Sequence, residues 1–170
     1  MKLSTHIFFT LLLMVTVFSC NNPKMPNGPS QIQSYPTPLV EDITTREEQQ
    51  AITPDTVLSR LKAGNKRFVE NNVTARDHSK MVRATASGQY PKSVVLSCLD
   101  SRIPVEDVFD KGIGDMFVAR NAGNIVNEDL LGSMEYACKV SGAKLILVMG
   151  HSGCGAIKSA VDVVKMGNIT

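Results

Sequence analysis

Residues 93–102 read Ser93-Val94-Val95-Leu96-Ser97-Cys98-Leu99-Asp100-Ser101-Arg102, an apolar run followed at once by reactive side chains. Two more short apolar runs follow along the chain, at Met116–Ala119 and at Leu145–Met149. Short runs that are apolar on both faces are typical of strands covered on both sides, as in a parallel sheet. We therefore expect a strand at each of the three runs.

Helical patterns lie before and between these runs, and they set the fold class. Thr53-Pro54 pairs an N-cap with the proline that suits the first helical position, and apolar residues then recur at helical spacing. Strands that alternate with helices predict an α/β fold, with a mostly parallel β-sheet flanked by helices. The expected helices are one that opens at Thr53-Pro54, a weaker one over Lys80–Ser87, and Pro104–Asp110, Glu128–Ser141 and Gly155–Met166.

Cysteine and histidine side chains follow the first and third runs directly. Cys98 comes after the first run, and His151 follows the third with only Gly150 between, shortly before Cys154. The carboxyl ends of parallel strands meet at one edge of a sheet, where neighbouring strands lie about 5 Å apart. If the two strands are neighbours, two thiolates and one imidazole can reach a single ion. Zn²⁺ prefers such ligands, and three of them leave a fourth position open for water.

A disulfide between Cys98 and Cys154 is the alternative, and an exported protein could support one. That pairing would leave His151 and Asp100 without a role, so we favour the metal site.

Asp100 and Arg102 lie close to this site in the sequence. An aspartate two residues from a ligand can accept a hydrogen bond from the reactive oxygen at a metal. An arginine can grip that carboxylate with two bonds and keep it ionised. We therefore predict that Asp100 and Arg102 take part in catalysis, with a surface salt bridge in a loop as the alternative.

Length and charge narrow the remaining possibilities. At 170 residues, the chain is expected to hold one folded domain, which we place at residues 53–170. The formal net charge is only +2 and no run of lysine or arginine occurs. We expect no nucleic-acid partner, because binding to nucleic acid requires a basic patch or stripe.

The first 52 residues differ in kind from the rest. Lys2 precedes an apolar run over Ile7–Phe18, which has the length of a signal peptide and is short for a membrane span. The run ends at Ser19-Cys20, which resembles the lipobox of bacterial lipoproteins, with ordinary secretion and a free Cys20 as the alternative. We expect a signal peptide at residues 1–19, then a lipidated Cys20 and a proline-rich tether over residues 20–52. The protein would then be an exported bacterial lipoprotein, anchored to a membrane and facing the periplasm or the cell exterior.

Four motifs occur in the sequence: Cys98-x-Asp100-Ser101-Arg102, Gly114-Asp115-x-Phe117-Val118-x-Arg120-Asn121-Ala122-Gly123-Asn124, Ser133-Met134-Glu135-Tyr136-Ala137 and His151-x-x-Cys154-Gly155. In their order and spacing they resemble the motifs of the β-class carbonic anhydrases, and the resemblance covers about residues 53–168. By this resemblance the fold is an α/β sheet with an N-terminal helical arm, in a homodimer or a higher homo-oligomer. The resemblance also implies one Zn²⁺ per chain, held by Cys98, His151 and Cys154.

An activity and further site residues are implied as well. The expected reaction is the reversible hydration of carbon dioxide to bicarbonate and a proton, by attack of zinc-bound hydroxide. Asp100 and Arg102 would form a catalytic pair. The residues expected to contact substrate are Gln89, Phe117, Tyr136 and Gly155. An exposed loop position for Gln89 and a strand-core position for Phe117 are the alternatives.

Members of this family usually continue beyond the helix that follows the second cysteine, whereas this sequence ends at Thr170. We therefore expect the domain to lack its C-terminal part and the third strand to expose an edge. Two alternatives stay open beside the carbonic anhydrase. One is a zinc-binding remnant with impaired catalysis, and the other is a related hydrolase of another small linear substrate such as carbon disulfide.

Overall fold

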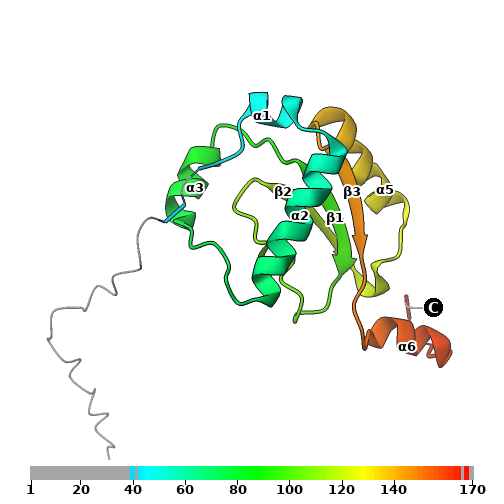
Figure 1. Ribbon diagram of the computed structural model, residues 1–170. Coiled ribbons are helices and arrows are strands. Elements are labelled where there is room, and N and C mark those ends of the chain that lie inside the picture. The colour runs from blue at the N-terminus through cyan, green and yellow to red at the C-terminus, as the bar shows by residue number, and fades with distance from the viewer. Residues whose placement is uncertain (1–38, 41, 166, 169–170) are drawn as a thin grey trace, which may run out of the picture. The chain divides into compact units, whose positions relative to one another are not determined.

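The structure of the protein, a computed structural model, describes residues 39–40, 42–165 and 167–168 (Figure 1). The expected signal peptide at residues 1–19, the expected lipidation site Cys20 and much of the expected tether lie outside the described residues. Within the described part of the chain, no helix combines the length and the apolar character that crossing a membrane requires.

Three parallel strands form the centre of the fold. β1 (Ser93–Cys98) lies between β2 (Met116–Asn121) and β3 (Leu145–Met149) and runs parallel to both (Figure 1). The register pairs Cys98 with Asn121 on one side and Ser97 with Met149 on the other. The three expected strands and the parallel sheet are therefore confirmed. The two strands that precede the candidate ligands, β1 and β3, are neighbours.

The bounds of the helices are α1 Arg46–Ala51, α2 Pro54–Val69, α3 His78–Thr85, α4 Val105–Val108, α5 Glu128–Glu135 and α6 Gly155–Val161. α2 begins where the sequence predicts, because the Thr53 hydroxyl accepts a hydrogen bond from the Thr56 amide. α3 begins earlier than the expected Lys80, since the Asp77 side chain accepts the Lys80 amide and caps the helix at His78.

The long helix expected over Glu128–Ser141 contains two conformations. α5 ends at Glu135, and a π-helical turn over Tyr136–Val140 continues it, with the Ser141 amide donating to the Tyr136 carbonyl at 3.1 Å. Gly142 then takes φ +83°, the left-handed conformation in which glycine commonly ends a helix, so the expected end is confirmed.

α1 is a helix in a segment that we expected to belong to the tether. Thr45 and Glu48 form a capping box, in which each side chain accepts the backbone amide of the other residue. Gln49 is buried, and its side-chain amide donates to the Pro91 carbonyl at 2.6 Å and to the Ser141 carbonyl at 2.8 Å. These bonds join α1 to the residues just before β1 and β3. The folded part therefore begins before Thr53, and the expected boundary is too late.

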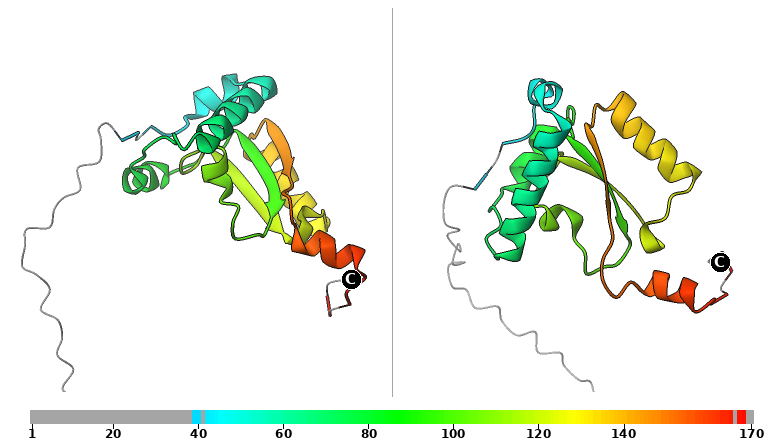
Figure 2. Two further views of the ribbon diagram at one scale, coloured as in Figure 1. Left: turned by 60° about the horizontal axis from the view of Figure 1, so that its bottom comes forward. Right: turned by 45° about the vertical axis from the view of Figure 1, so that its right-hand side comes forward.

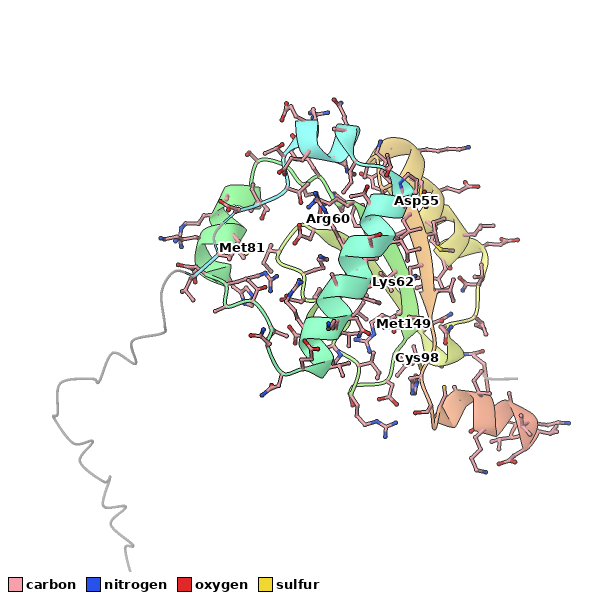
Figure 3. All side chains as sticks on the ribbon, in the orientation of Figure 1. Asp55, Arg60, Lys62, Met81, Cys98 and Met149 are labelled. Atoms are coloured by element: carbon pink, nitrogen blue, oxygen red, sulfur yellow. The ribbon has the colours of Figure 1, made fainter. Side chains whose placement is uncertain are left out.

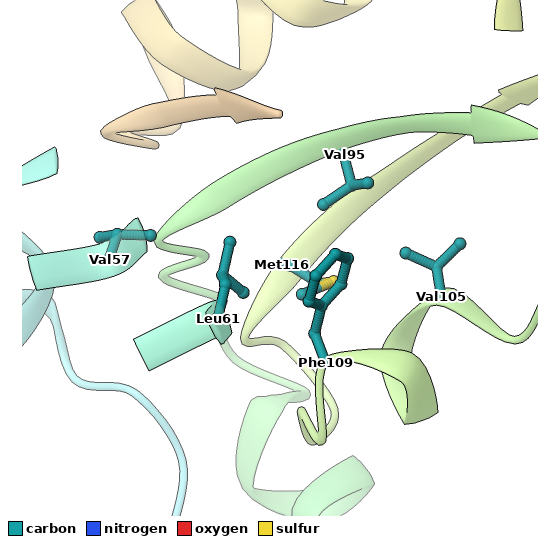
Figure 4. Packing of buried hydrophobic residues seen from close by; sticks show 6 residues of the cluster. All are labelled: Val57, Leu61, Val95, Val105, Phe109 and Met116. Carbon is teal, nitrogen blue, oxygen red and sulfur yellow. The ribbon is translucent and has the colours of Figure 1, made fainter. Parts of the chain in front are cut away.

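Helices lie on both faces of the sheet (Figure 2). α2 and α4 cover one face, through the buried cluster that Figure 4 labels: Val57, Leu61, Val95, Val105, Phe109 and Met116. α5 and the π-helical turn cover the other face, where the buried residues are Val94, Leu96, Met134, Ala137 and Ala143. Every residue of β1 is buried, which confirms the expected cover on both faces for this strand.

β3 is covered on one face only within the described residues. Leu145, Leu147 and Met149 pack against the cluster beneath α2, whereas Ile146 is 47% exposed and Val148 is 58% exposed. The apolar run at Leu145–Met149 led us to expect that helices cover both faces of this strand, and that expectation is wrong for β3. In the described sheet, β3 is an edge strand, as expected.

Candidate metal centre

The carboxyl ends of β1 and β3 bring the three expected ligands together. Cys98 is the last residue of β1, His151 follows β3 after Gly150, and Cys154 is the N-cap of α6. Their ligand atoms all lie within 4.8 Å of one another. Figure 3 labels Cys98 and Met149, the last residues of the two strands, at the same end of the sheet.

The distance between the two sulfurs and the unpaired Nε2 atom of His151 fit the coordination of a zinc ion. Tetrahedral coordination with Zn–S bonds of about 2.3 Å places two sulfurs about 3.8 Å apart. The Sγ atoms of Cys98 and Cys154 lie 3.8 Å apart, and both cysteines are free. His151 Nδ1 lies 3.0 Å from the Ser152 carbonyl, to which it can donate, while Nε2 is buried without a hydrogen-bond partner. A proton on Nδ1 leaves the Nε2 lone pair available to a metal.

The surroundings of Cys98 favour its thiolate. The Gly123 amide donates to the Cys98 sulfur, and together with the His151 side chain and weaker donors this bond outweighs burial and lowers the pKa of the thiol to about 7. Cys98 in turn raises the pKa of His151. A thiolate is the form of cysteine that binds a metal, so this environment prepares Cys98 as a ligand. Gly123 follows β2 and has φ +74°, a backbone conformation that residues with a side chain rarely adopt.

Asp100 and Arg102 form the expected ion pair beside the three ligands. Arg102 donates from Nε to Asp100 Oδ1 at 2.9 Å and from Nη2 to Oδ2 at 2.7 Å, and its backbone amide also reaches Oδ1. These bonds hold the pKa of the Asp100 carboxyl far below its usual range. Asp100 Oδ2 lies 3.9 Å from His151 Nε2, so the carboxylate borders the metal-ligand group. The bidentate grip fixes Asp100 as a hydrogen-bond acceptor there.

Of the expected substrate contacts, only Gly155 lies next to the ligands in this chain. It follows Cys154 directly, and no atom lies within 4 Å of where its Cβ would be. Gln89 precedes β1 at the end opposite Cys98, and the strand between them spans about 16 Å. Gln89 and Tyr136 line one cavity of about 360 Å³, and Phe117 and Tyr136 line another of about 540 Å³. Neither cavity is lined by a metal ligand.

Two residues of the site were not assigned a role from the sequence. Gly123 donates its amide to Cys98, and Arg120 donates to the carbonyls of Cys98 and Asp100 at 2.9 Å and 2.6 Å. Arg120 belongs to β2, and Gly123 follows that strand shortly afterwards. A signal was present, because the carboxyl end of β2 must lie at the same sheet edge as the ends of β1 and β3.

The sequence and the fold are similar to those of known carbonic anhydrases. Residues 93–170 match the carbonic anhydrase family model. "Carbonic anhydrase 2" of Mycobacterium tuberculosis is 44% identical over 110 residues, which cover 64% of this chain and 53% of that protein. A carbonic anhydrase of Mycolicibacterium smegmatis is 42% identical over 110 residues, with the same shares covered.

A solved structure supports the fold. The β-carbonic anhydrase of the fungus Aspergillus fumigatus superimposes with a TM-score of 0.50 and 24% identity, covering 68% of this chain and 54% of that chain. The chain thus spans about half the length of these two curated relatives.

Proposed function

We propose that this chain is a β-class carbonic anhydrase, which catalyses the reversible hydration of carbon dioxide to bicarbonate and a proton. One observation carries the proposal: Cys98, His151 and Cys154 offer a three-atom ligand group, with the ionised Asp100 at its border. Three ligands leave a position open for a reactant, whereas a structural zinc site uses all four.

Each residue of the site has a distinct task in this reaction. Cys98, His151 and Cys154 hold one Zn²⁺, which supplies the Lewis acidity that makes a water molecule nucleophilic near neutral pH. Asp100 Oδ2 accepts a hydrogen bond from the attacking water, and this orients a lone pair of the water toward the carbon of carbon dioxide. Arg102 keeps Asp100 ionised and holds it in place with two bonds, so Asp100 does not turn toward the ligand atoms.

We also propose that the chain works as a homodimer or a higher homo-oligomer. Gln89, Phe117 and Tyr136 lie away from the metal ligands of their own chain, so they can contact substrate only at the site of another copy.

Complementation between two variants tests this shared site. A mixture of the D100N and Q89A chains, refolded together, should regain activity above that of either variant alone, since pairing creates one intact site. A mixture of D100N with C154S is the control, because both changes damage the same part of the site. Equal results for the two mixtures would contradict a shared site.

Attachment to a membrane through a lipid on Cys20 remains part of the proposal. Its support is the sequence of residues 1–20, where an apolar run ends at Ser19-Cys20. Incorporation of labelled palmitate into the full chain in bacteria, and its loss in C20S, would support this anchor. Equal labelling of both chains would contradict it.

Stopped-flow measurement of carbon dioxide hydration by the purified, zinc-loaded full chain tests the proposed reaction. The proposal predicts proton release above the uncatalysed rate, loss of this activity after removal of zinc by a chelator, and recovery when zinc is restored. Zinc bound at one per chain without hydration would instead indicate a binding remnant. Hydrolysis of carbon disulfide without hydration of carbon dioxide would indicate the alternative substrate.

A further inference from the structure

Arg120 on β2 connects the loop that carries Asp100 to the neighbouring strand. Its Nε donates to the Cys98 carbonyl at 2.9 Å, and its Nη2 donates to the Asp100 carbonyl at 2.6 Å. The guanidinium of Arg120 therefore holds the backbone on both sides of Leu99. One of the two bonded residues is the candidate ligand Cys98, and the other is Asp100, whose carboxylate borders the ligand group.

Few other contacts hold this loop. Leu99 is 59% exposed, and Ser101 and Arg102 are also exposed. The Leu99 amide donates to the Asn121 carbonyl at 3.0 Å, the Asp100 backbone bonds Cys98, and Ile103 at the end of the loop packs against the core cluster beneath α2. The other hydrogen bonds given for residues 99–103, apart from those of Arg120, lie within the loop. Within the described residues, Arg120 is the side chain of the sheet that donates hydrogen bonds to this loop and to the end of β1 that leads into it.

The positions of the two carbonyls suit the side chain of arginine and not that of lysine. Its planar guanidinium presents donors in a rigid fork, so it can satisfy two carbonyls at fixed positions, whereas a lysine ammonium is a single compact donor group. Arg102, by contrast, holds only the carboxylate of Asp100 and is itself part of the loop. A residue outside the loop is therefore needed to hold the pair of Asp100 and Arg102 at a fixed distance from the candidate ligands.

We propose that Arg120 is a positioning residue for the hydration reaction, which fixes the Asp100 carboxylate relative to the metal ligands by holding the Cys98 and Asp100 carbonyls. This inference rests on the proposed function. Arg120 itself need touch neither substrate nor metal. Cys98 is also held by the pairing of β1 with both neighbours, so loss of Arg120 should disturb Asp100 more than it disturbs the ligands.

Two variants and a matched control test this role in the full chain. R120Q removes the fork and the charge, R120K keeps the charge alone, and R83Q removes an exposed arginine on α3 for which no side-chain hydrogen bond or ion pair is found among the described residues. In both Arg120 variants we expect one zinc per chain, an unchanged KM and a kcat lowered about 10- to 100-fold, since a small misplacement of a catalytic group has costs of this order. R83Q should match the wild type.

Amide hydrogen exchange supplies a readout that does not depend on activity. Exchange at Leu99 and Ile103 should become faster in R120Q and R120K, while exchange within β1 should not change. Unchanged exchange in the loop, an unchanged kcat, or loss of zinc or of folding in R120K would overturn the inference. If the wild-type chain hydrates no carbon dioxide, the proposed function fails, and loop exchange alone then decides whether Arg120 holds the loop.

Discussion

At the scale of single residues, the contact between Asp100 and Arg102 sets the chemistry available to the candidate metal centre. Two side-chain bonds from Arg102 keep Asp100 ionised, and Asp100 Oδ2 lies 3.9 Å from the Nε2 atom of the candidate ligand His151. An ionised carboxylate at this position can only accept hydrogen bonds. It therefore favours one orientation of a reacting water, which is a role that a surface salt bridge would not have.

Replacement of Asp100 by asparagine should separate catalysis from metal binding. D100N keeps the size of the side chain but introduces an amide donor, so we expect zinc to remain at one per chain while kcat falls about 10- to 100-fold or more. Zinc content and stopped-flow hydration measure the two effects. D55N, at an exposed position in the first turn of α2, is the control and should be fully active. Wild-type turnover in D100N would refute the role given to Asp100.

Removal of one sulfur should abolish the metal site without unfolding the domain. Cys154 is only half-buried, and C154S removes a thiolate that an open three-ligand site cannot spare, so we expect loss of stoichiometric zinc. C138A is the matched control, because Cys138 packs against the cluster on the other face of the sheet. Metal analysis after dialysis reports the result. Zinc retained at one per chain in C154S would show that the ligand set is wrong.

The grouping of Cys98, His151 and Cys154 could be predicted from the sequence, because each lies shortly after the end of an apolar run. The roles of Arg120 and Gly123 could not, since they depend on the register of β2 with β1, which pairs Asn121 with Cys98. Gln89 shows the opposite limit. Its place before β1 put it nine residues from Cys98 in the sequence, but an extended strand separates them in space.

At the scale of elements, a buried carboxylate joins α2, α4 and the segment between α2 and α3. Asp110 follows α4 with its side chain fully buried, where it accepts bonds from Arg67 and Arg76 and from the amide and hydroxyl of Thr74. Burial opposes its charge, but these donors outweigh burial and hold the pKa of the carboxyl far below its usual range. The cluster therefore stabilises the fold only while Asp110 is ionised.

This cluster predicts how stability depends on pH. A folded-state pKa below the unfolded value adds stability that is fully present above pH about 4 and is lost as the pH falls toward the folded pKa. Urea unfolding of the wild type should therefore show a free energy of unfolding that drops on acidification below pH 4. D110N should show a weaker drop, and at pH 7 it should cost about 3 kcal/mol, since it removes the charge that pairs with the half-buried Arg67 and Arg76.

Asparagine tolerates the left-handed backbone at this position, where φ is +49°, so strain does not confuse the comparison. Equal pH dependence in D110N and the wild type would contradict the role of the cluster.

The packing of α1 makes a separate prediction. Gln49 is 5% exposed and donates to the buried carbonyl of Pro91 and the half-buried carbonyl of Ser141, so Q49A should leave both without this donor and cost about 1–3 kcal/mol of unfolding free energy. Q50A changes the neighbouring exposed glutamine and should have little effect. Denaturant unfolding of both variants measures the difference. Similar stabilities would indicate that α1 does not dock through Gln49.

The helix α1 was missed although a local signal for it exists. Thr45 and Glu48 have the spacing of a capping box, but the segment looks like a continuation of the polar tether because it has no apolar stripe. Long-range contacts hold it in place, namely the two bonds from Gln49 and the contact of Arg46 with Tyr90, and no local pattern in the sequence indicates them. The longer elements were predictable, since α2 and the three strands have strong periodicity and clear caps or turns.

At the scale of the whole molecule, the described residues form one sheet, and the candidate metal ligands and Asp100 lie at the carboxyl ends of its strands. The strand ends supply Cys98, His151 and Arg120 from three different strands or their continuations, so the site depends on the order β2-β1-β3. The exposed side chains of Ile146 and Val148 on β3 are an apolar surface on this chain, which spans about half the length of its curated relatives.

Zinc K-edge X-ray absorption on the full chain, loaded with one equivalent of Zn²⁺, measures the coordination sphere itself. We predict two sulfurs at about 2.3 Å, one imidazole nitrogen at about 2.0 Å and one additional light atom, because Cys98, His151 and Cys154 leave a single position open. A spectrum without sulfur neighbours, a fully sulfur-ligated metal, or folded protein that binds no zinc and has Cys98 joined to Cys154 would contradict the account.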